Sequence, residues 1–166
     1  MNLPALWRCI QCGECCRHLV GQKFGMAVTP EEKKRLEILA KRRGINIHFL
    51  PLTWNGYKVT LYQIADKICP FLRNNRCSIY EWRPLACRMY PVHPYGISEC
   101  TMLHRLQRRG FQVIFPPQVE AAGKKYAATI IPLIKTAVKR YNLSRGWEDP
   151  YPLHFKYRLT YGRIPT

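Results

Sequence analysis

The sequence Cys9-Ile10-Gln11-Cys12-Gly13-Glu14-Cys15-Cys16 places four of the chain's eight cysteines within eight residues. In a reducing compartment no oxidant pairs such thiols, and thiols this dense are costly to keep free. A metal that binds them as thiolates is the simplest explanation. We therefore expect a small cysteine-rich domain that forms around bound metal.

The other four cysteines lie in a second region. Cys69-Pro70-Phe71-Leu72 and Cys77-Ser78-Ile79-Tyr80 are two short apolar runs on either side of Arg73-Asn74-Asn75-Arg76. This pattern predicts a β-hairpin, which would bring Cys69 and Cys77 close together. Cys87 and Cys100 follow at intervals that contain no C-x2-C spacing.

The spacing of the first cysteines favours an iron–sulfur cluster. Cys9, Cys12 and Cys15 form a C-x2-C-x2-C run, which is typical of 4Fe-4S sites that take a fourth thiolate from far along the chain. Cys69 before Pro70 resembles the Cys-Pro pair of bacterial ferredoxins. Zinc is the alternative, because four thiolates also make a closed structural site, although the usual double C-x2-C arrangement is absent.

The number of metal sites stays open. Side chains of the neighbours Cys15 and Cys16 point in different directions, so they are poorly placed to share one metal. Two adjacent sites with interleaved ligands are one solution, and one cluster with additional structural thiols is the other. Since eight thiolates suffice for two four-coordinate sites, we expect the nearby histidines to be ordinary surface or packing residues: His18, His93 and His104. Four disulfides are a less favoured alternative.

Helix signals are clearest after the first cysteine segment. Thr29 is a good N-cap, Pro30 suits the first helical position, and Glu32 completes a capping box. The helix should run to about Arg43 and end at Gly44. The 28 residues before it are expected to be irregular, with Gly13, Gly21 and Gly25 able to adopt positive φ angles.

The remaining pattern predicts an α+β fold. Residues 57–64 alternate as a short strand, and residues 84–91 form one or two helical turns between prolines. A further strand is expected over residues 111–115, followed by a long helix over residues 118–141 that Gly123 and Pro132 weaken. We expect a metal-binding domain over residues 1–141 and a separate tail over residues 142–166.

The chain is strongly basic. Lys and Arg number 27 against 10 Asp and Glu, which gives a net charge of +17 and a pI near 9.9. Such an excess favours a polyanionic partner, and RNA or the ribosome is the expected one. The tail interleaves rings with basic groups, which suits stacking on bases and contact with phosphates: Trp147, Tyr151, His154, Phe155, Lys156, Tyr157, Arg158, Tyr161 and Arg163. Packing of these rings onto the domain is the alternative.

No membrane segment is expected. The first residues contain no apolar run of signal-peptide length, and no stretch approaches the roughly 20 apolar residues that span a bilayer. We therefore expect a cytoplasmic protein.

Several ordered motifs resemble one family. These are the C-x2-C-x2-C-C start, Thr29-Pro30-Glu31-Glu32, the two cysteine runs of residues 69–72 and 77–80, Arg83-Pro84 and Cys87-Arg88-Met89-Tyr90-Pro91. Over about residues 8–100 the chain resembles the CxxCxxCC family of zinc- or iron-chelating, YkgJ-type cysteine cluster proteins. The resemblance implies that Arg83, Pro84 and Arg88 support a metal site formed by all eight cysteines: Cys9, Cys12, Cys15, Cys16, Cys69, Cys77, Cys87 and Cys100.

Three functions fit the sequence. The first is a protein whose iron–sulfur cluster or zinc serves electron transfer or redox sensing with a partner protein. The second is a zinc-stabilised protein that binds RNA or the ribosome. The third is an enzyme or enzyme subunit that acts on protein lysines, because flagellin lysine methylases look like distant relatives of the family. This chain is much shorter than those methylases and has no nucleotide-type glycine loop, which argues against methyl transfer. The sequence does not identify catalytic residues for any other reaction.

Overall fold

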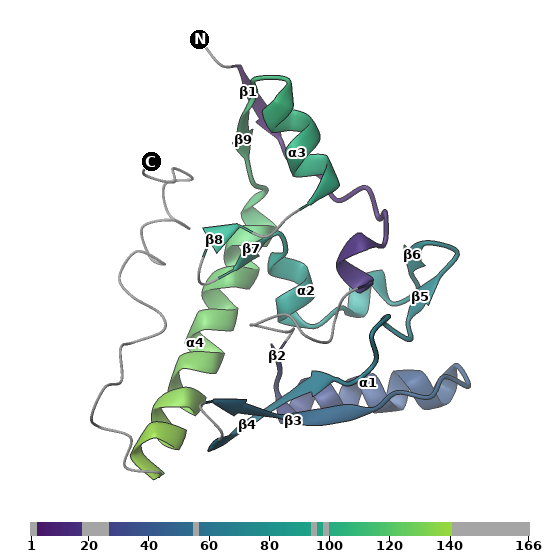
Figure 1. The fold of residues 1–166 in the computed structure, drawn as a ribbon, viewed down its shortest axis with the longest axis vertical. Helices are drawn as coiled ribbons and strands as arrows, with labels where there is room; N and C mark the ends of the chain where they lie inside the picture. The colour runs from purple at the N-terminus through teal and green to yellow at the C-terminus, as the bar shows by residue number, and fades with distance from the viewer. Residues whose placement is uncertain (1–2, 18–26, 55–56, 94–95, 98–99, 141–166) are drawn as a thin grey trace.

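The computed structural model describes residues 3–17, 27–54, 57–93, 96–97 and 100–140. These residues form the expected α+β fold (Figure 1). The helices are α1 (Pro30–Arg42), α2 (Leu85–Met89), α3 (Thr101–Arg108) and α4 (Pro117–Arg140), with 3-10 turns η1 (Glu14–Cys16) and η2 (Tyr80–Trp82). The strands are β1 (Pro4–Leu6), β2 (Ala27–Val28), β3 (Phe49–Trp54), β4 (Tyr57–Ile64), β5 (Leu72–Arg73), β6 (Arg76–Cys77), β7 (Val92–His93), β8 (Gly96–Ile97) and β9 (Gln112–Ile114).

Helix α1 confirms the capping signals of the sequence. The hydroxyl of Thr29 accepts a hydrogen bond of 3.2 Å from the backbone N–H of Glu32. Oε2 of Glu32 accepts one of 3.1 Å from the backbone N–H of Thr29, which completes the capping box. The chain leaves the helix through Gly44, whose φ of 61° is easiest for a residue without a Cβ. Leu36 on the inner face is fully buried.

The first hydrophobic core lies between α1 and a small antiparallel sheet. Strand β4 has the predicted bounds and pairs with β2 on one side and β3 on the other. The inner faces of the sheet, helix and hairpin meet in a cluster of buried residues that includes two cysteines: Cys16, Val28, Leu36, Ala40, Ile64, Cys69, Phe71 and Ile79. The elements that enclose this first core, α1 and the strands β2, β3 and β4, lie in the lower part of Figure 1.

The second hydrophobic core is built by α3, α4 and the ends of the cysteine region. Strand β1 pairs in parallel with β9, with Ala5 opposite Val113. The buried members of this core again include a cysteine: Trp7, Val92, Cys100, Leu103, Val119 and Ala127. Figure 1 shows β1, β9 and α3 at the opposite end of the molecule from α1.

The long helix α4 spans both parts of the molecule. It packs against α2, β4 and β7, and Figure 1 shows it running from the β9 end to the β3–β4 end. The first half of the helix buries four side chains along one face: Val119, Ala122, Tyr126 and Ile130. Pro132 lies inside the helix, as the sequence predicts.

Several elements differ from the sequence-based expectation. The segment before α1 was expected to be irregular, yet its described part contains β1, η1 and β2. Helix α3 and strands β3, β7 and β8 were not predicted. Gly21, Gly25 and the tail of residues 142–166 lie outside the described residues, so the expectations about them remain predictions.

Among the described helices, none combines the length and the apolar character needed to cross a bilayer.

Candidate metal centre

The first cysteine segment turns sharply at Gly13. This residue has a φ of 76° and precedes η1, the turn that carries Cys15 and Cys16. A Cβ at Gly13 would lie 2.8 Å from the backbone oxygen of Asn75, closer than Cβ atoms approach in proteins. Arg17 also donates a hydrogen bond to the side-chain oxygen of Asn75. The cysteine segment is therefore fixed against the turn of the β5–β6 hairpin.

The β5–β6 hairpin confirms the predicted proximity of the second cysteine pair. Asn74 and Asn75 have φ angles of 47° and 61°, so both residues of the two-residue loop adopt the left-handed region that tight hairpins use. The backbone N–H of Cys69 donates a hydrogen bond of 2.7 Å to the carbonyl of Cys16. Cys77 lies on β6 and pairs with Leu72. Backbone contacts thus gather Cys16, Cys69 and Cys77.

Helix α2 positions the seventh cysteine, Cys87. The helix begins after Pro84, as predicted. The buried side chain of Glu32 reaches this helix, because its Oε1 accepts a hydrogen bond of 2.8 Å from the backbone N–H of Leu85. Glu32 therefore satisfies backbone donors at the starts of both α1 and α2, which fixes the Cys87 helix against the first core.

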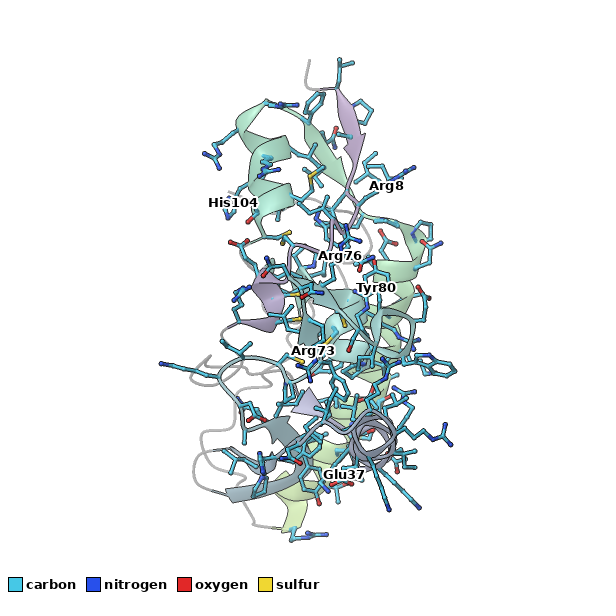
Figure 2. The ribbon with its side chains drawn as sticks, turned by 90° about the vertical axis from the view of Figure 1, so that its right-hand side faces the viewer. Arg8, Glu37, Arg73, Arg76, Tyr80 and His104 are labelled. Carbon is cyan, nitrogen blue, oxygen red and sulfur yellow. The ribbon has the colours of Figure 1, made fainter. Side chains whose placement is uncertain are left out.

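All eight cysteines line one cavity of about 60 Å³. Residues of both cores contribute to its wall, including Leu36 and Phe71 of the first core and Trp7 of the second. Figure 2 shows the sulfur atoms gathered in the middle of the molecule, between Glu37 on α1 and His104 on α3. The structure thus brings together eight thiols that the sequence spreads over 92 residues.

Cys16 is the centre of a group of touching thiols. Its thiol forms hydrogen bonds with Cys15, Cys69 and Cys77. The bond with Cys15 lowers the pKa of Cys16, but the bonds with the other two thiols and burial outweigh it, so the pKa is raised overall. The pKa of Cys77 is lowered to about 6, mainly because its sulfur accepts the hydrogen bond from Cys16. One thiolate is therefore favoured within this group even without metal.

The pKa values of two further thiols are raised. Hydrogen bonding with Cys16, followed by burial, raises the pKa of Cys15. Desolvation raises the pKa of Cys87 well above its ordinary value, and the charges of Cys15 and Cys77 add to the shift. In the metal-free protein both thiols stay protonated at neutral pH, so a metal must displace their protons to bind.

Two tyrosines, Tyr80 and Tyr90, also line the cavity. Burial, followed by the charges of Cys100, Cys15 and Cys12, raises the pKa of Tyr90. Tyr80 forms a hydrogen bond with Cys9, and its pKa is raised mainly by burial. The sequence reasoning assigned no role to these tyrosines, and only their positions beside the Cys77 and Cys87 motifs could have indicated one.

Arg83 supplies positive charge beside the thiols, as the family resemblance implied. It lines the cavity, and its charge contributes to the lowered pKa of Cys77 and partly opposes the increases in the pKa values of Cys15 and Cys87. Its guanidinium lies 3.6 Å from the ring centroid of Tyr80, and its Nε donates a hydrogen bond of 2.7 Å to the Tyr80 carbonyl. A charge fixed in this way favours the thiolate form that metals bind.

Arg88 acts one step further from the cavity. Its Nε donates a hydrogen bond of 2.7 Å to the carbonyl of Arg83, and its Nη2 donates one of 3.2 Å to the carbonyl of Glu81. Arg88 thereby holds the backbone turn from which Arg83 projects. Pro84 lies in the cavity wall and starts α2.

The donor set fits zinc or iron, since thiolates are the ligands that these metals share. The buried indole N–H of Trp7 also supports a metal–thiolate site. Trp7 lines the cavity with 4% of its surface exposed, and its Nε1–H has no hydrogen-bond partner among the described residues. Thiolate sulfur would be an acceptor for it. In the described residues, no three Cys, His, Asp or Glu side chains are arranged as a ready-made set of metal ligands.

The histidines do not join this donor set where the structure describes them. His104 lies exposed on α3, outside the cavity wall. His48 lies 3.7 Å from the carboxylate of Asp66 and is not part of the cavity wall. His18 and the side chain of His93 lie outside the described residues. Their expected role as surface or packing residues therefore remains a prediction.

Comparison with known proteins identifies the family. Neither the curated proteins nor the solved structures contain a match to this chain. A family profile with the description "CxxCxxCC: Putative zinc- or iron-chelating domain" matches residues 8–109, which is more than half of the 166 residues and includes all eight cysteines. The chain therefore belongs to the CxxCxxCC family of zinc- or iron-chelating domains.

Proposed function

We propose that this protein holds an iron–sulfur cluster or zinc through its eight cysteines, and that the site serves electron transfer or redox sensing. The observation that carries the proposal is the convergence of all eight thiols on one cavity between the two cores. The residues come from the first loop, the hairpin, α2 and the start of α3. Ligands so far apart in sequence make metal binding and folding one process.

The surface near the cavity suits an acidic redox partner. Cys12 is exposed, whereas the other seven cysteines are buried or partly buried. Arg8, Arg73 and Arg76 are exposed as well, and Figure 2 shows all three on the face turned toward the viewer. Positive charge around an accessible metal ligand would steer an acidic protein to the place where electrons can leave.

Elemental analysis and visible absorption of the anaerobically purified protein test this proposal. Iron with acid-labile sulfide and a visible charge-transfer band that bleaches on reduction supports the redox role. Zinc without iron would leave metal binding intact and contradict electron transfer at this site. Absence of both metals from protein that is folded would contradict the proposal as a whole.

A matched pair of variants locates the site. Cys87→Ser removes a thiol of the cavity wall and should lower bound metal by at least half. His104→Ala changes an exposed residue of α3 and should leave the metal content unchanged. Equal metal loss in the two variants would contradict the all-cysteine donor set.

As a second candidate, we propose that the protein binds RNA through its basic surface. Among the described residues only two ion pairs occur, Lys33–Glu37 and His48–Asp66, so most basic side chains in these regions have no acidic partner. Three of them lie exposed around the end of α3: Arg105, Arg108 and Arg109. Unpaired guanidinium groups in a group of this kind support contact with phosphates.

A further inference from the structure

We infer that Glu14 is a positioning residue of the metal centre: it holds the start of α3, and with it Cys100, against the first cysteine segment. This inference rests on the proposed metal binding. It assigns a role to a side chain that is not itself a ligand in that proposal and that the sequence reasoning left without one.

Glu14 connects two segments that lie far apart in the sequence. The hydroxyl of Thr101 donates a hydrogen bond to Oε2 of Glu14, although the two residues are 87 positions apart. Both residues line the cavity that the eight cysteines share. The contact therefore lies at the candidate metal centre, where it joins the first cysteine segment to α3.

The backbone of Glu14 is held in a short turn that also carries two cysteines. Glu14 is the first residue of η1, and the N–H of Arg17 donates a hydrogen bond of 2.9 Å to its carbonyl. The side chain of Arg17 donates a second hydrogen bond to Asn75 of the hairpin. Because the turn is fixed at both ends, the Glu14 side chain can hold another element at a defined distance from the cysteines of η1.

Thr101 passes this fixed position on to Cys100. Cys100 is the N-cap of α3, and its carbonyl accepts a hydrogen bond of 2.9 Å from the N–H of His104. Its side chain caps no backbone N–H, and the first turn of α3 contains no acidic residue. The carboxylate of Glu14 supplies the negative group that the start of a helix favours. A helix start held in this way moves together with Cys100.

The position of Cys100 matters because the cysteines belong to different cores. Cys100 is buried in the second core, together with Leu103 of the same helix, whereas Cys16 and Cys69 are buried in the first. Metal–thiolate bonds have narrow lengths, about 2.3 Å for zinc, so the separation of the two cores must be set accurately. The Glu14–Thr101 hydrogen bond sets this separation at the start of α3.

Alkylation of the zinc-saturated protein, mapped by mass spectrometry, tests the inference. A thiolate bound to zinc is not free to attack the reagent, so the alkylation rate at each cysteine measures how often that cysteine leaves the metal. In Glu14→Ala the rate at Cys100 should rise about tenfold, as is typical when a residue that supports a ligand is removed, while the rate at Cys69 stays unchanged. Thr101→Val removes the hydroxyl at nearly constant volume and should have the same effect, so it carries the test if Glu14→Ala does not fold.

Two further variants separate positioning from general stabilisation. Glu14→Gln keeps a side-chain oxygen that can accept the hydrogen bond from Thr101, and it should restore the protection of Cys100. Glu31→Ala removes an exposed acidic residue of α1 and should leave the alkylation rates of all cysteines unchanged.

The outcomes distinguish this inference from the proposed function. An unchanged rate at Cys100, or an equal rise at Cys100 and Cys69, would overturn the role of Glu14 while leaving metal binding intact. Failure of Glu14→Gln to restore protection would overturn the hydrogen bond as its cause. If zinc protected none of the cysteines in the folded wild-type protein, the proposed metal binding itself would be wrong.

Discussion

Gly13 is the residue on which the geometry of the first cysteine segment depends most directly. Its φ is 76°, and a Cβ would meet both the backbone oxygen of Asn75 and the side chain of Leu72 at 2.8 Å. Gly44 has a similar φ of 61°, but no atom lies within 4 Å of its Cβ position. The two glycines therefore share the same backbone requirement and differ in packing.

This comparison yields the first prediction. Gly44→Ala should cost about 1 kcal/mol, which is the usual penalty for a left-handed alanine. Gly13→Ala should cost about 2 kcal/mol or more, because the hairpin must also move away from the loop. Denaturant unfolding of the metal-loaded variants measures both values. Equal destabilisation by the two changes would show that the loop does not pack on the hairpin as described.

At the scale of elements, Glu32 connects two helices through one carboxylate. It accepts hydrogen bonds from the backbone N–H groups of Thr29 and Leu85, at the starts of α1 and α2. Glu32→Ala leaves both donors without this partner inside the protein and should destabilise it by about 2 to 3 kcal/mol. Glu31→Ala changes the exposed neighbour in the same helical turn and should cost less than about 1 kcal/mol. Thermal unfolding of both variants provides the comparison, and similar midpoints would contradict the role of Glu32.

Elements with local signals could be predicted from the sequence, and elements without them could not. The capping box fixed the start of α1, alternation fixed the bounds of β4, and the Asn74-Asn75 loop indicated the hairpin. Strand β1 was missed because its parallel partner β9 lies more than 100 residues away. Helix α3 was missed because its eight residues follow Cys100, which provides no side-chain cap, and because Leu103 is its one buried residue.

The same distinction applies to the candidate site. Eight cysteines in a chain that was expected in a reducing compartment indicated metal binding, and the predicted hairpin indicated that Cys69 and Cys77 are close. Their grouping with Cys16, and the positions of Trp7, Tyr80 and Tyr90 in or beside the cavity, depend on how the two cores pack. Local sequence contains no signal for that arrangement.

At the scale of the whole molecule, metal uptake should release protons. The pKa of Cys15 is raised by its hydrogen bond with Cys16, and the pKa of Cys87 is raised by desolvation, so both are protonated at pH 7 in the metal-free state. Metals bind thiolates, so each such ligand gives up a proton on binding. Affinity should therefore rise by about tenfold per pH unit for each proton released and fall as the pH falls.

Calorimetry in two buffers of different ionisation enthalpy measures this release. The binding heat should differ between the buffers by an amount that corresponds to at least two protons. A heat that does not depend on the buffer would mean that these thiols are already ionised before the metal arrives.

The predicted RNA binding is also a property of the whole molecule. If about five phosphates are neutralised, the affinity for single-stranded RNA should fall with added salt at a log–log slope of about −3 to −4. Removal of residues 142–166 should flatten this slope and leave the metal bound. Absence of binding at low salt would exclude RNA as the partner, and loss of the metal on truncation would show that the tail belongs to the domain.

The central claim is that metal bound by the eight cysteines joins the two hydrophobic cores, and chelation tests it most directly. Complete metal removal from the reduced protein should abolish the cooperative thermal transition and lower the far-UV dichroism, because a structural metal contributes on the order of 10 kcal/mol to folding. Re-addition of zinc or iron should restore both signals. Native dichroism and an unchanged thermal midpoint in fully metal-free protein would contradict the claim.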